Sequence, residues 1–198
     1  MQRSTWKSLF VVLLAALVGL GAGSRTVMAV TSTFAGGWSL AITTASNPTT
    51  RIDADAYVKQ SKPDRNYGLV DTVNVSGTDD PRKGYVRFTI ASVSGSITHA
   101  VLRLYVTDNG TQNGPELYGT STSWSETTIT WNTAPPAGAL IDDKGALPKN
   151  TWVEYDVTPF VSGNGTYSFN LAGPSTDGID FNAREAATLR PELVLTLP

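Results

Sequence analysis

The feature that most constrains this chain is a period-two alternation of apolar and polar residues, which recurs in short segments after residue 51. Gly, Pro, Asn and Asp separate these segments, at a spacing of roughly ten residues that is typical of sandwiches and barrels. No long segment of this region has the apolar stripe of a helix. Because each segment has one apolar and one polar face, we predict an all-β, antiparallel, jelly-roll-like β-sandwich.

The alternation also predicts which side chains form the core. In 84–91, Val86 and Phe88 share the apolar face, and Tyr85 and Arg87 lie on the opposite face. The same pattern is found in 97–107, 152–158, 167–171 and 193–197. In a jelly-roll-like closure we expect the early segment 53–59 to lie beside the last one, 192–197.

The beginning of the chain has the form of a secretory signal. Arg3 and Lys7 precede an apolar run at 9–20, and the small-residue exit Val27-Met28-Ala29 follows. This order predicts a signal peptide over 1–29, cleaved after Ala29 and leading to a secreted protein. An uncleaved anchor helix is the alternative interpretation.

The remaining chain divides into two parts by composition. Residues 30–50 are rich in Thr, Ser, Ala and Gly and are predicted to be a flexible tether or a loose first strand, and 51–198 form one sandwich domain. Loss of 1–29 removes three basic residues and no acid, so 12 basic and 17 acidic residues remain, with a net charge of -5. An acidic protein is a poor match for nucleic acid, and we expect no membrane contact after cleavage.

The composition also limits the chemistry. The chain has no Cys and a single His, His99, which excludes disulfides, thiol nucleophiles and multi-histidine metal centres. No nucleophile elbow or phosphate-binding glycine loop is present. We therefore predict that the protein is not an enzyme. The alternative, a small polysaccharide hydrolase or lyase, would use Glu154, Asp156 or His99.

Aromatic rings and arginines on the outward strand faces indicate a binding surface. Rings stack on the apolar faces of sugars, and guanidinium groups form paired contacts with carboxylates. If the strands 84–91 and 97–107 are neighbours, their four outward side chains, Tyr85, Arg87, Arg103 and Tyr105, share one surface. Trp152, on the outward face of another strand, is a further candidate. The predicted ligand-binding residues are Tyr85, Arg87, Arg103, Tyr105 and Trp152. The alternative is that the arginines pair with Glu154 and Asp156 across the strands.

A structural calcium ion is the one cofactor that the sequence suggests. Exported proteins without cysteine can be stabilised by this ion, which binds carboxylate and carbonyl oxygens. The candidate ligands are Asp53, Asp55 and Glu185, with Asp71 and Asp180 as further carboxylates. Asp53 and Asp55 are two residues apart in one predicted strand, so we expect them on the same face.

Eight short motifs occur in an order that resembles the DNRLRE domain, which is related to disaggregatase repeats and similar to carbohydrate-binding module family 96. They are 55–58 (DAYV), 66–68 (NYG), 86–88 (VRF), 100–105 (AVLRLY), 123–131 (SWSETTITW), 155–158 (YDVT), 181–185 (FNARE) and 190–193 (RPEL). The resemblance covers about 52–197. It implies a jelly-roll β-sandwich that binds extracellular polysaccharide without catalysis, with alginate-like uronates as the characterised ligands. Its pattern residues are Asp55, Asn66, Arg87, Arg184 and Glu185.

Two functional hypotheses follow from these observations. The first is a secreted, non-catalytic domain that binds an extracellular or cell-wall polysaccharide, with uronate-containing chains as one class of ligand. The second is a structural or adhesion domain that contacts protein or the cell wall. Selective binding of glycans separates the first hypothesis from the second.

Overall fold

The computed structural model describes residues 31–33, 39–41, 48–107 and 109–198. The predicted signal peptide and most of the predicted tether lie outside the described residues. Within the tether, β1 (Thr31–Thr33) and β2 (Ser39–Ala41) form an antiparallel pair. No helix long and apolar enough to cross a bilayer occurs in the described parts of the chain.

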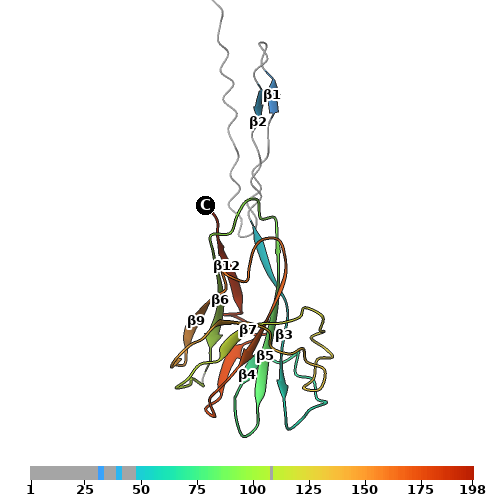
Figure 1. Cartoon of the computed structure of the whole chain (residues 1–198), viewed down its shortest axis with the longest axis vertical. Helices are drawn as coiled ribbons and strands as arrows, with labels where there is room; N and C mark the ends of the chain where they lie inside the picture. The colour runs from blue at the N-terminus through green and yellow to red at the C-terminus, as the bar shows by residue number, and fades with distance from the viewer. Residues whose placement is uncertain (1–30, 34–38, 42–47, 108) are drawn as a thin grey trace, which may run out of the picture.

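Ten further strands form two antiparallel sheets, each with five strands (Figure 1). The first, here called the β5 sheet, has the order β3 (Thr49–Lys59), β5 (Arg82–Ala91), β10 (Gly165–Ala172), β7 (Glu116–Gly119) and β8 (Leu140–Asp142). The second, the β6 sheet, has the order β12 (Glu192–Thr196), β6 (His99–Val106), β11 (Ile179–Asn182) and β4 (Thr72–Val75), and β9 (Thr151–Asp156) also pairs with β6. The predicted all-β sandwich is confirmed.

The alternation places the core as expected. Val86, Phe88 and Ile90 of β5 are at most 2% exposed, and they pack in one cluster with the inward residues of the β6 sheet. The inward residues of β6 and β9 are also buried: Ala100, Leu102, Leu104, Val106, Val153 and Tyr155. Apolar side chains of both sheets therefore fill the space between them, which is the main source of stability in such a fold.

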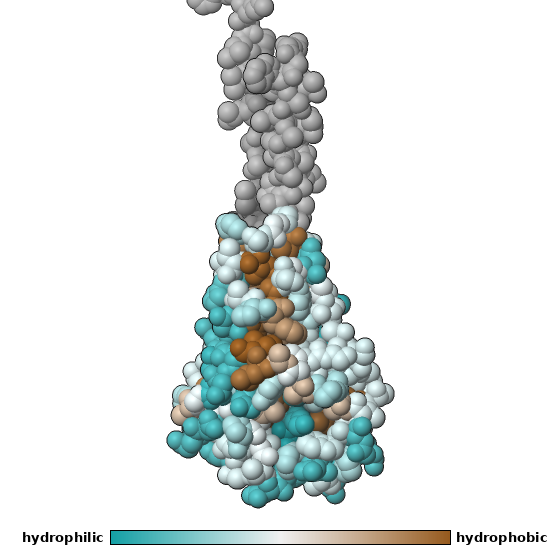
Figure 2. All heavy atoms as spheres, viewed as in Figure 1, coloured by the Kyte–Doolittle hydropathy of each residue, from teal (hydrophilic) through white to brown (hydrophobic). Residues whose placement is uncertain are grey.

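One expected strand pairing is wrong. β3 pairs with β5 and β12 pairs with β6, so the two strands belong to different sheets. They end the orders of their sheets and contact each other across the seam between the sheets. Figure 2 shows a narrow hydrophobic band with hydrophilic side chains beside it on this view of the molecule. The two strands that were expected side by side in one sheet thus meet at the edges of two sheets.

A β-bulge in β3 changes which way its acids point. The register between β3 and β5 shifts between Ile52 and Ala54, so Asp53 is an extra residue in the ladder. Asp53 accepts a hydrogen bond from Thr89 on the outward face of β5, and Asp55 pairs with the inward Val86. The expectation that Asp53 and Asp55 share a face is therefore wrong, because the bulge interrupts the alternation.

A long loop covers part of the outward face of the β5 sheet. This loop, residues 120–138, contains turns where the 123–131 motif lies, with backbone bonds from Ile129 N to Ser125 O and from Ala134 N to Thr130 O. Trp124 and Ile129 pack on the outward side chains of β3 and β5, and Trp124 donates a buried hydrogen bond to Ser168. The loop thereby forms a second small core outside the sandwich.

Candidate functional site

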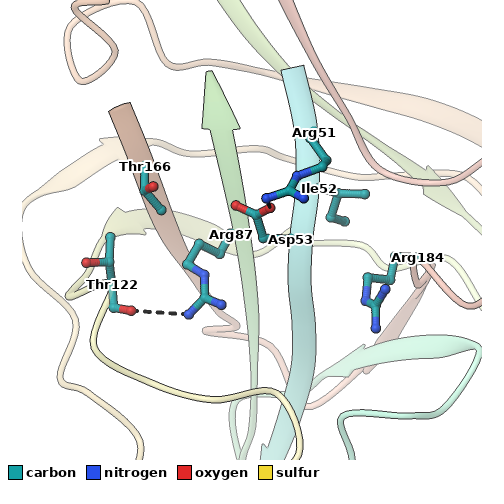
Figure 3. Close-up of a pocket in the computed structure, with 7 residues that line it drawn as sticks. All are labelled: Arg51, Ile52, Asp53, Arg87, Thr122, Thr166 and Arg184. Carbon is teal, nitrogen blue, oxygen red and sulfur yellow. Dashed lines mark hydrogen bonds and ion pairs between the residues drawn. The ribbon is translucent and has the colours of Figure 1, made fainter. Parts of the chain in front are cut away.

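An open cleft of about 700 Å³ lies beside loop 120–138 on the outward side of the β5 sheet. Its walls come from β3, β5, β10, the loop and the segment after β11. The lining residues are Arg51, Ile52, Asp53, Arg87, Thr122, Thr166 and Arg184 (Figure 3). Three of these seven side chains are guanidinium groups and one is a carboxylate, so we call it the arginine cleft.

Among the residues that the structure describes, no carboxylate forms an ion pair with Arg87 of the arginine cleft. Its Nη1 donates to the carbonyl oxygens of Thr122 at 3.2 Å and Trp124 at 2.6 Å. Its guanidinium carbon lies 4.9 Å from the centroid of the Trp124 ring. These partners orient the group and leave its charge uncompensated. A planar cation held in this way suits paired hydrogen bonds to a carboxylate.

Arg51 forms the exposed rim of the arginine cleft. Its side chain is 77% exposed and its Nη2 lies 2.6 Å from Asp53. Asp53 also accepts a hydrogen bond from Thr89, whose hydroxyl contacts Thr166 at 3.0 Å. Hydroxyl groups and an exposed guanidinium therefore continue the polar surface that begins at Arg87. Such groups match the hydroxyls and carboxylates of a sugar.

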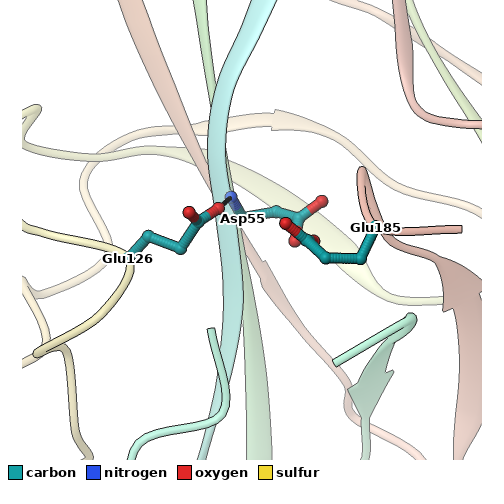
Figure 4. Close-up of side chains that lie close together, drawn as sticks. All are labelled: Asp55, Glu126 and Glu185. Atoms are coloured by element: carbon teal, nitrogen blue, oxygen red, sulfur yellow. Dashed lines mark hydrogen bonds between the residues drawn. The ribbon is translucent and has the colours of Figure 1, made fainter. Parts of the chain in front are cut away.

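Arg184 lies across β3 from Arg87 (Figure 3). It contacts a cluster of three carboxylates, Asp55, Glu126 and Glu185, which Figure 4 shows close together. Its Nε and Nη2 donate to the two carboxylate oxygens of Glu126 at 2.6 and 2.5 Å, and Nη2 is 3.0 Å from Glu185. Asp55 accepts a hydrogen bond from the Arg184 backbone N–H at 2.6 Å, and Glu126 accepts one from the Asp55 N–H at 2.9 Å. The cluster thus links β3, loop 120–138 and the segment after β11.

The electrostatics of this cluster follow from its burial. Desolvation, together with the charges of Glu185 and Glu126, raises the pKa of Asp55 to about 7, although the Arg184 N–H acts in the opposite direction. Desolvation also raises the pKa of Glu185. The hydrogen bonds to Glu126 raise the pKa of Arg184, which keeps this group charged. Near neutral pH the cluster can therefore hold a proton at Asp55.

Two of the three predicted metal ligands belong to this cluster. Carboxylate oxygens of Asp55, Glu126 and Glu185 lie within 4.8 Å of one another, whereas Asp53 pairs with Arg51 instead. The donor type suits calcium, which takes 6–8 oxygen ligands. Arg184 already engages Glu126 and Glu185, so an ion would share these carboxylates with the guanidinium. A calcium ion at this place stays a prediction.

Further contacts fasten loop 120–138 to the domain. The Asn66 amide donates to the backbone oxygens of Glu126 and Ile129, at 2.8 Å each, and its oxygen accepts from Gly68 N. A Cβ at Gly68 would lie 1.8 Å from the Glu126 backbone oxygen, so only glycine allows this approach. Four of the DNRLRE pattern residues thus share one physical role, which is to position the loop: Asp55, Asn66, Arg87 and Arg184.

The predicted binding surface of four residues is not formed, because β5 and β6 belong to different sheets. Tyr85 is 1% exposed, lies under loop 120–138 and donates its hydroxyl to the Pro135 carbonyl at 2.9 Å. Burial raises its pKa to about 12. Tyr85 is therefore a packing residue, since the loop covers the outward face that the alternation gave it.

Arg103, Tyr105 and Trp152 do meet, on the outward face of the β6 sheet. The Arg103 guanidinium carbon is 4.5 Å from the centroid of the Trp152 ring, and Tyr105 contacts the same ring edge to face at 5.5 Å. Arg103 is also paired with Glu154 at 2.9 Å and with Glu192 at 2.6 Å. Its charge is thus compensated, as the cross-strand alternative expected for Glu154.

The candidate catalytic residues lie on this same β6 face. His99 Nε2 is 3.9 Å from Asp156, and both side chains are more than half exposed. Hydrogen bonds from Thr158 lower the pKa of Asp156, and Glu154 pairs with Arg103. None of the three lines the arginine cleft. A general acid usually has a raised pKa, which is the opposite of what Asp156 has.

The family of the chain follows from a comparison with known families. The sequence profile described as carbohydrate-binding module family 96 matches residues 46–197, which contain the whole sandwich. The chain belongs to this family. It is a carbohydrate-binding domain, and the resemblance to the DNRLRE domain is compatible with this assignment. A comparison with curated proteins gave no match.

The carbohydrate-binding domain contains cleft residues that sequence reasoning missed as binding residues. Arg51 and Asp53 are two residues apart, which in a strand indicates a same-face ion pair, and this signal was available. Glu126 lies inside the 123–131 motif, but no local pattern indicates that it contacts Arg184. Thr122 and Thr166 gave no signal, since only the tertiary structure brings them together.

Proposed function

We propose that this protein is a secreted, non-catalytic domain that binds a uronate-containing extracellular polysaccharide in the arginine cleft. The observation that carries the proposal is the uncompensated Arg87 guanidinium, which is oriented by two carbonyls beside the exposed Arg51. Uronate carboxylates are the groups that such guanidinium pairs recognise best among sugar substituents. The predicted signal peptide supports export.

The local charge of the cleft supports an acidic ligand although the whole chain is acidic. Of the three arginines that line the cleft, Arg51 is paired with Asp53 and Arg184 with Glu126 and Glu185, which leaves the charge of Arg87 for a ligand, whereas the chain has a net charge of -2, or -5 after removal of 1–29. A ligand in contact with the protein responds mainly to the nearby charges, because salt screens distant ones over about 8–10 Å. The acidic remainder of the surface then disfavours nonspecific binding of other polyanions.

A non-catalytic role is supported by the arrangement of the acids. Of the cleft residues only Asp53 is a carboxylate, and it is engaged by Arg51 and Thr89. Glycoside hydrolysis needs two carboxyl groups that flank the scissile bond. Glu154 and Asp156, the alternative pair, lie on the opposite sheet and are engaged by Arg103 and Thr158.

The proposal is tested by titrating the protein with alginate and with a neutral glucan in a calorimeter. We expect binding of the uronate polymer alone, weakened by added salt. A double variant, Arg51→Gln with Arg87→Gln, should lose at least about tenfold in affinity, since two charge-assisted contacts are removed. Arg103→Gln is the matched control, and its affinity should be unchanged.

Two results contradict the proposal. One is the absence of binding to every uronate polymer by the intact protein. The other is full affinity in the double variant while its melting temperature matches that of the intact protein. Shortened alginate products after long incubation would instead support the hydrolase or lyase alternative.

A further inference from the structure

A second cavity, of about 180 Å³, lies on the same outward side of the β5 sheet. Lys83 of this cavity and Arg87 of the arginine cleft both point outward from β5, and the Tyr85 between them is buried under loop 120–138. The loop therefore separates the two cavities. The lining residues are Val58, Lys83, Tyr85, Trp131, Ala134, Pro135 and Pro136, and we call this cavity the tryptophan pocket.

The walls of the tryptophan pocket combine flat apolar groups with one cation. Trp131, Pro135 and Pro136 supply rings against which the apolar face of a pyranose can pack. The Lys83 ammonium lies 5.0 Å from the centroid of the Trp131 ring, so the group against which it packs is aromatic and not acidic. A cation over an aromatic ring keeps most of its charge available to an anion. A sugar that carries a carboxylate matches both features.

We propose that the tryptophan pocket binds a uronate residue of the same polysaccharide chain that occupies the arginine cleft. This inference rests on the proposed function and adds a second contact to it. The lining of the pocket selects this ligand. Lys83 favours a carboxylate, and the apolar walls favour a sugar ring over a small inorganic anion. The ridge formed by loop 120–138 is then crossed by the ligand.

The distance between the two cavities makes the proposal depend on ligand length. Lys83 and Arg87 are four residues apart along β5, which corresponds to about 13 Å at the rise of a strand. A disaccharide in the arginine cleft leaves the tryptophan pocket empty, whereas a longer chain that crosses the loop contacts both. The second contact is then intramolecular and benefits from a high effective concentration.

The test is a calorimetric titration of the full protein with oligouronides from disaccharide to octasaccharide. We expect affinity to rise at least about tenfold once the oligomer is long enough to cross the loop. Lys83→Gln should abolish this gain and leave the disaccharide affinity unchanged, whereas Lys83→Arg should keep the gain. Lys149→Gln, an exposed lysine outside both cavities, removes the same charge and should behave like the intact protein.

The outcomes separate this inference from the proposed function. Failure of all lengths to bind overturns both. Binding of the disaccharide with no gain at greater length overturns the tryptophan pocket and leaves the arginine cleft standing. A gain that persists in Lys83→Gln, in a variant with an unchanged melting temperature, also overturns the pocket.

Discussion

The two outward faces of the sandwich carry similar residues but differ in the groups that compensate the charge of their arginines. On the β6 face, Arg103 lies over Trp152 and is paired with Glu154 and Glu192. On the β5 face, Arg87 lies over Trp124 at a similar distance, but its other partners are backbone carbonyls. An arginine beside an aromatic ring is thus available to a ligand only where no acid already holds it.

The faces also differ in how they are covered. Loop 120–138 lies on the β5 face and creates walls, so that both cavities described above form beside it. Neither cavity is lined by a strand of the β6 sheet, where the Glu154 and Glu192 side chains are 60% and 46% exposed. Concave sites bury more of a ligand than flat ones do, which favours the β5 face for recognition.

The largest expected effect is that of pH on the stability of the domain, through the carboxylate cluster under the β5 face. The pKa of Asp55 is raised to about 7, so the folded state keeps a proton that the unfolded chain releases near pH 4. Raising the pH from 4 to about 8 therefore lowers the free energy of unfolding, by about 4 kcal/mol at most, and the loss ends once the pH has passed through the folded pKa. Urea unfolding across this pH range measures the loss.

Asp55→Asn is the control for the pH effect. It keeps an oxygen for the Arg184 N–H and cannot ionise, so its stability should lack this decline and exceed that of the intact protein at pH 8. An equal decline in the variant would assign the pH dependence to other groups, such as Glu185.

The next effect compares one salt bridge on each face. Glu126→Gln weakens the paired contacts to Arg184, where the Glu126 side chain is only 11% exposed, and should cost about 2 kcal/mol. Glu154→Gln breaks a contact to Arg103 in which Glu154 is 60% exposed, and should cost less than about 1 kcal/mol. Equal costs in urea unfolding would show that burial does not distinguish the two faces.

A smaller effect is expected from freeing the arginine of the β6 face. In the double variant Glu154→Gln with Glu192→Gln, Arg103 loses both acid partners and lies beside Tyr105 and Trp152 without compensation. We expect the apparent affinity for alginate to rise about threefold, or about 0.7 kcal/mol, since one surface contact is added. An unchanged titration would mean that the missing concave walls, and not the acids, keep this face from binding.

The smallest effect is expected from calcium. If the ion binds at Asp55, Glu126 and Glu185, calcium at its Kd adds about 0.4 kcal/mol to stability at pH 8 and raises the melting temperature slightly. Asp55→Asn should remove the response, and magnesium should not replace calcium. Identical melting curves with calcium and with a chelator would exclude a site at this cluster.

The sequence was sufficient to predict the β-sandwich, because the alternation that identifies its strands is a local pattern. Val86, Phe88, Leu102 and Leu104 are buried where the period-two pattern places them. The pairing of β3 and β12 could not be derived in this way, because alternation does not determine which strand lies beside which. The bulge at Asp53 was also invisible, since one extra residue leaves no mark on composition.

The candidate site was predicted only in part, for a related reason. Arg87 was predicted from its outward position and lines the arginine cleft, and Asp55 and Glu185 were predicted from their chemistry and lie in the carboxylate cluster. Tyr85 has the same outward position as Arg87 but is buried, because a segment more than thirty residues later in the chain folds over it. Glu126, the centre of the cluster, is brought there by that same loop. Long-range contacts of loops are what single-strand patterns do not contain.

The way loop 120–138 leaves and rejoins the sheet has a consequence for how such modules diversify. Gly119 N donates to Ala139 O and Gly119 O accepts from Gly138 N, so the chain departs and returns at one point. Insertions among the exposed residues between these ends need not alter the strand register, much as hypervariable loops change on an antibody framework. A change of glycan preference is therefore open to this scaffold without a change of architecture, as long as Glu126 and its partners are kept.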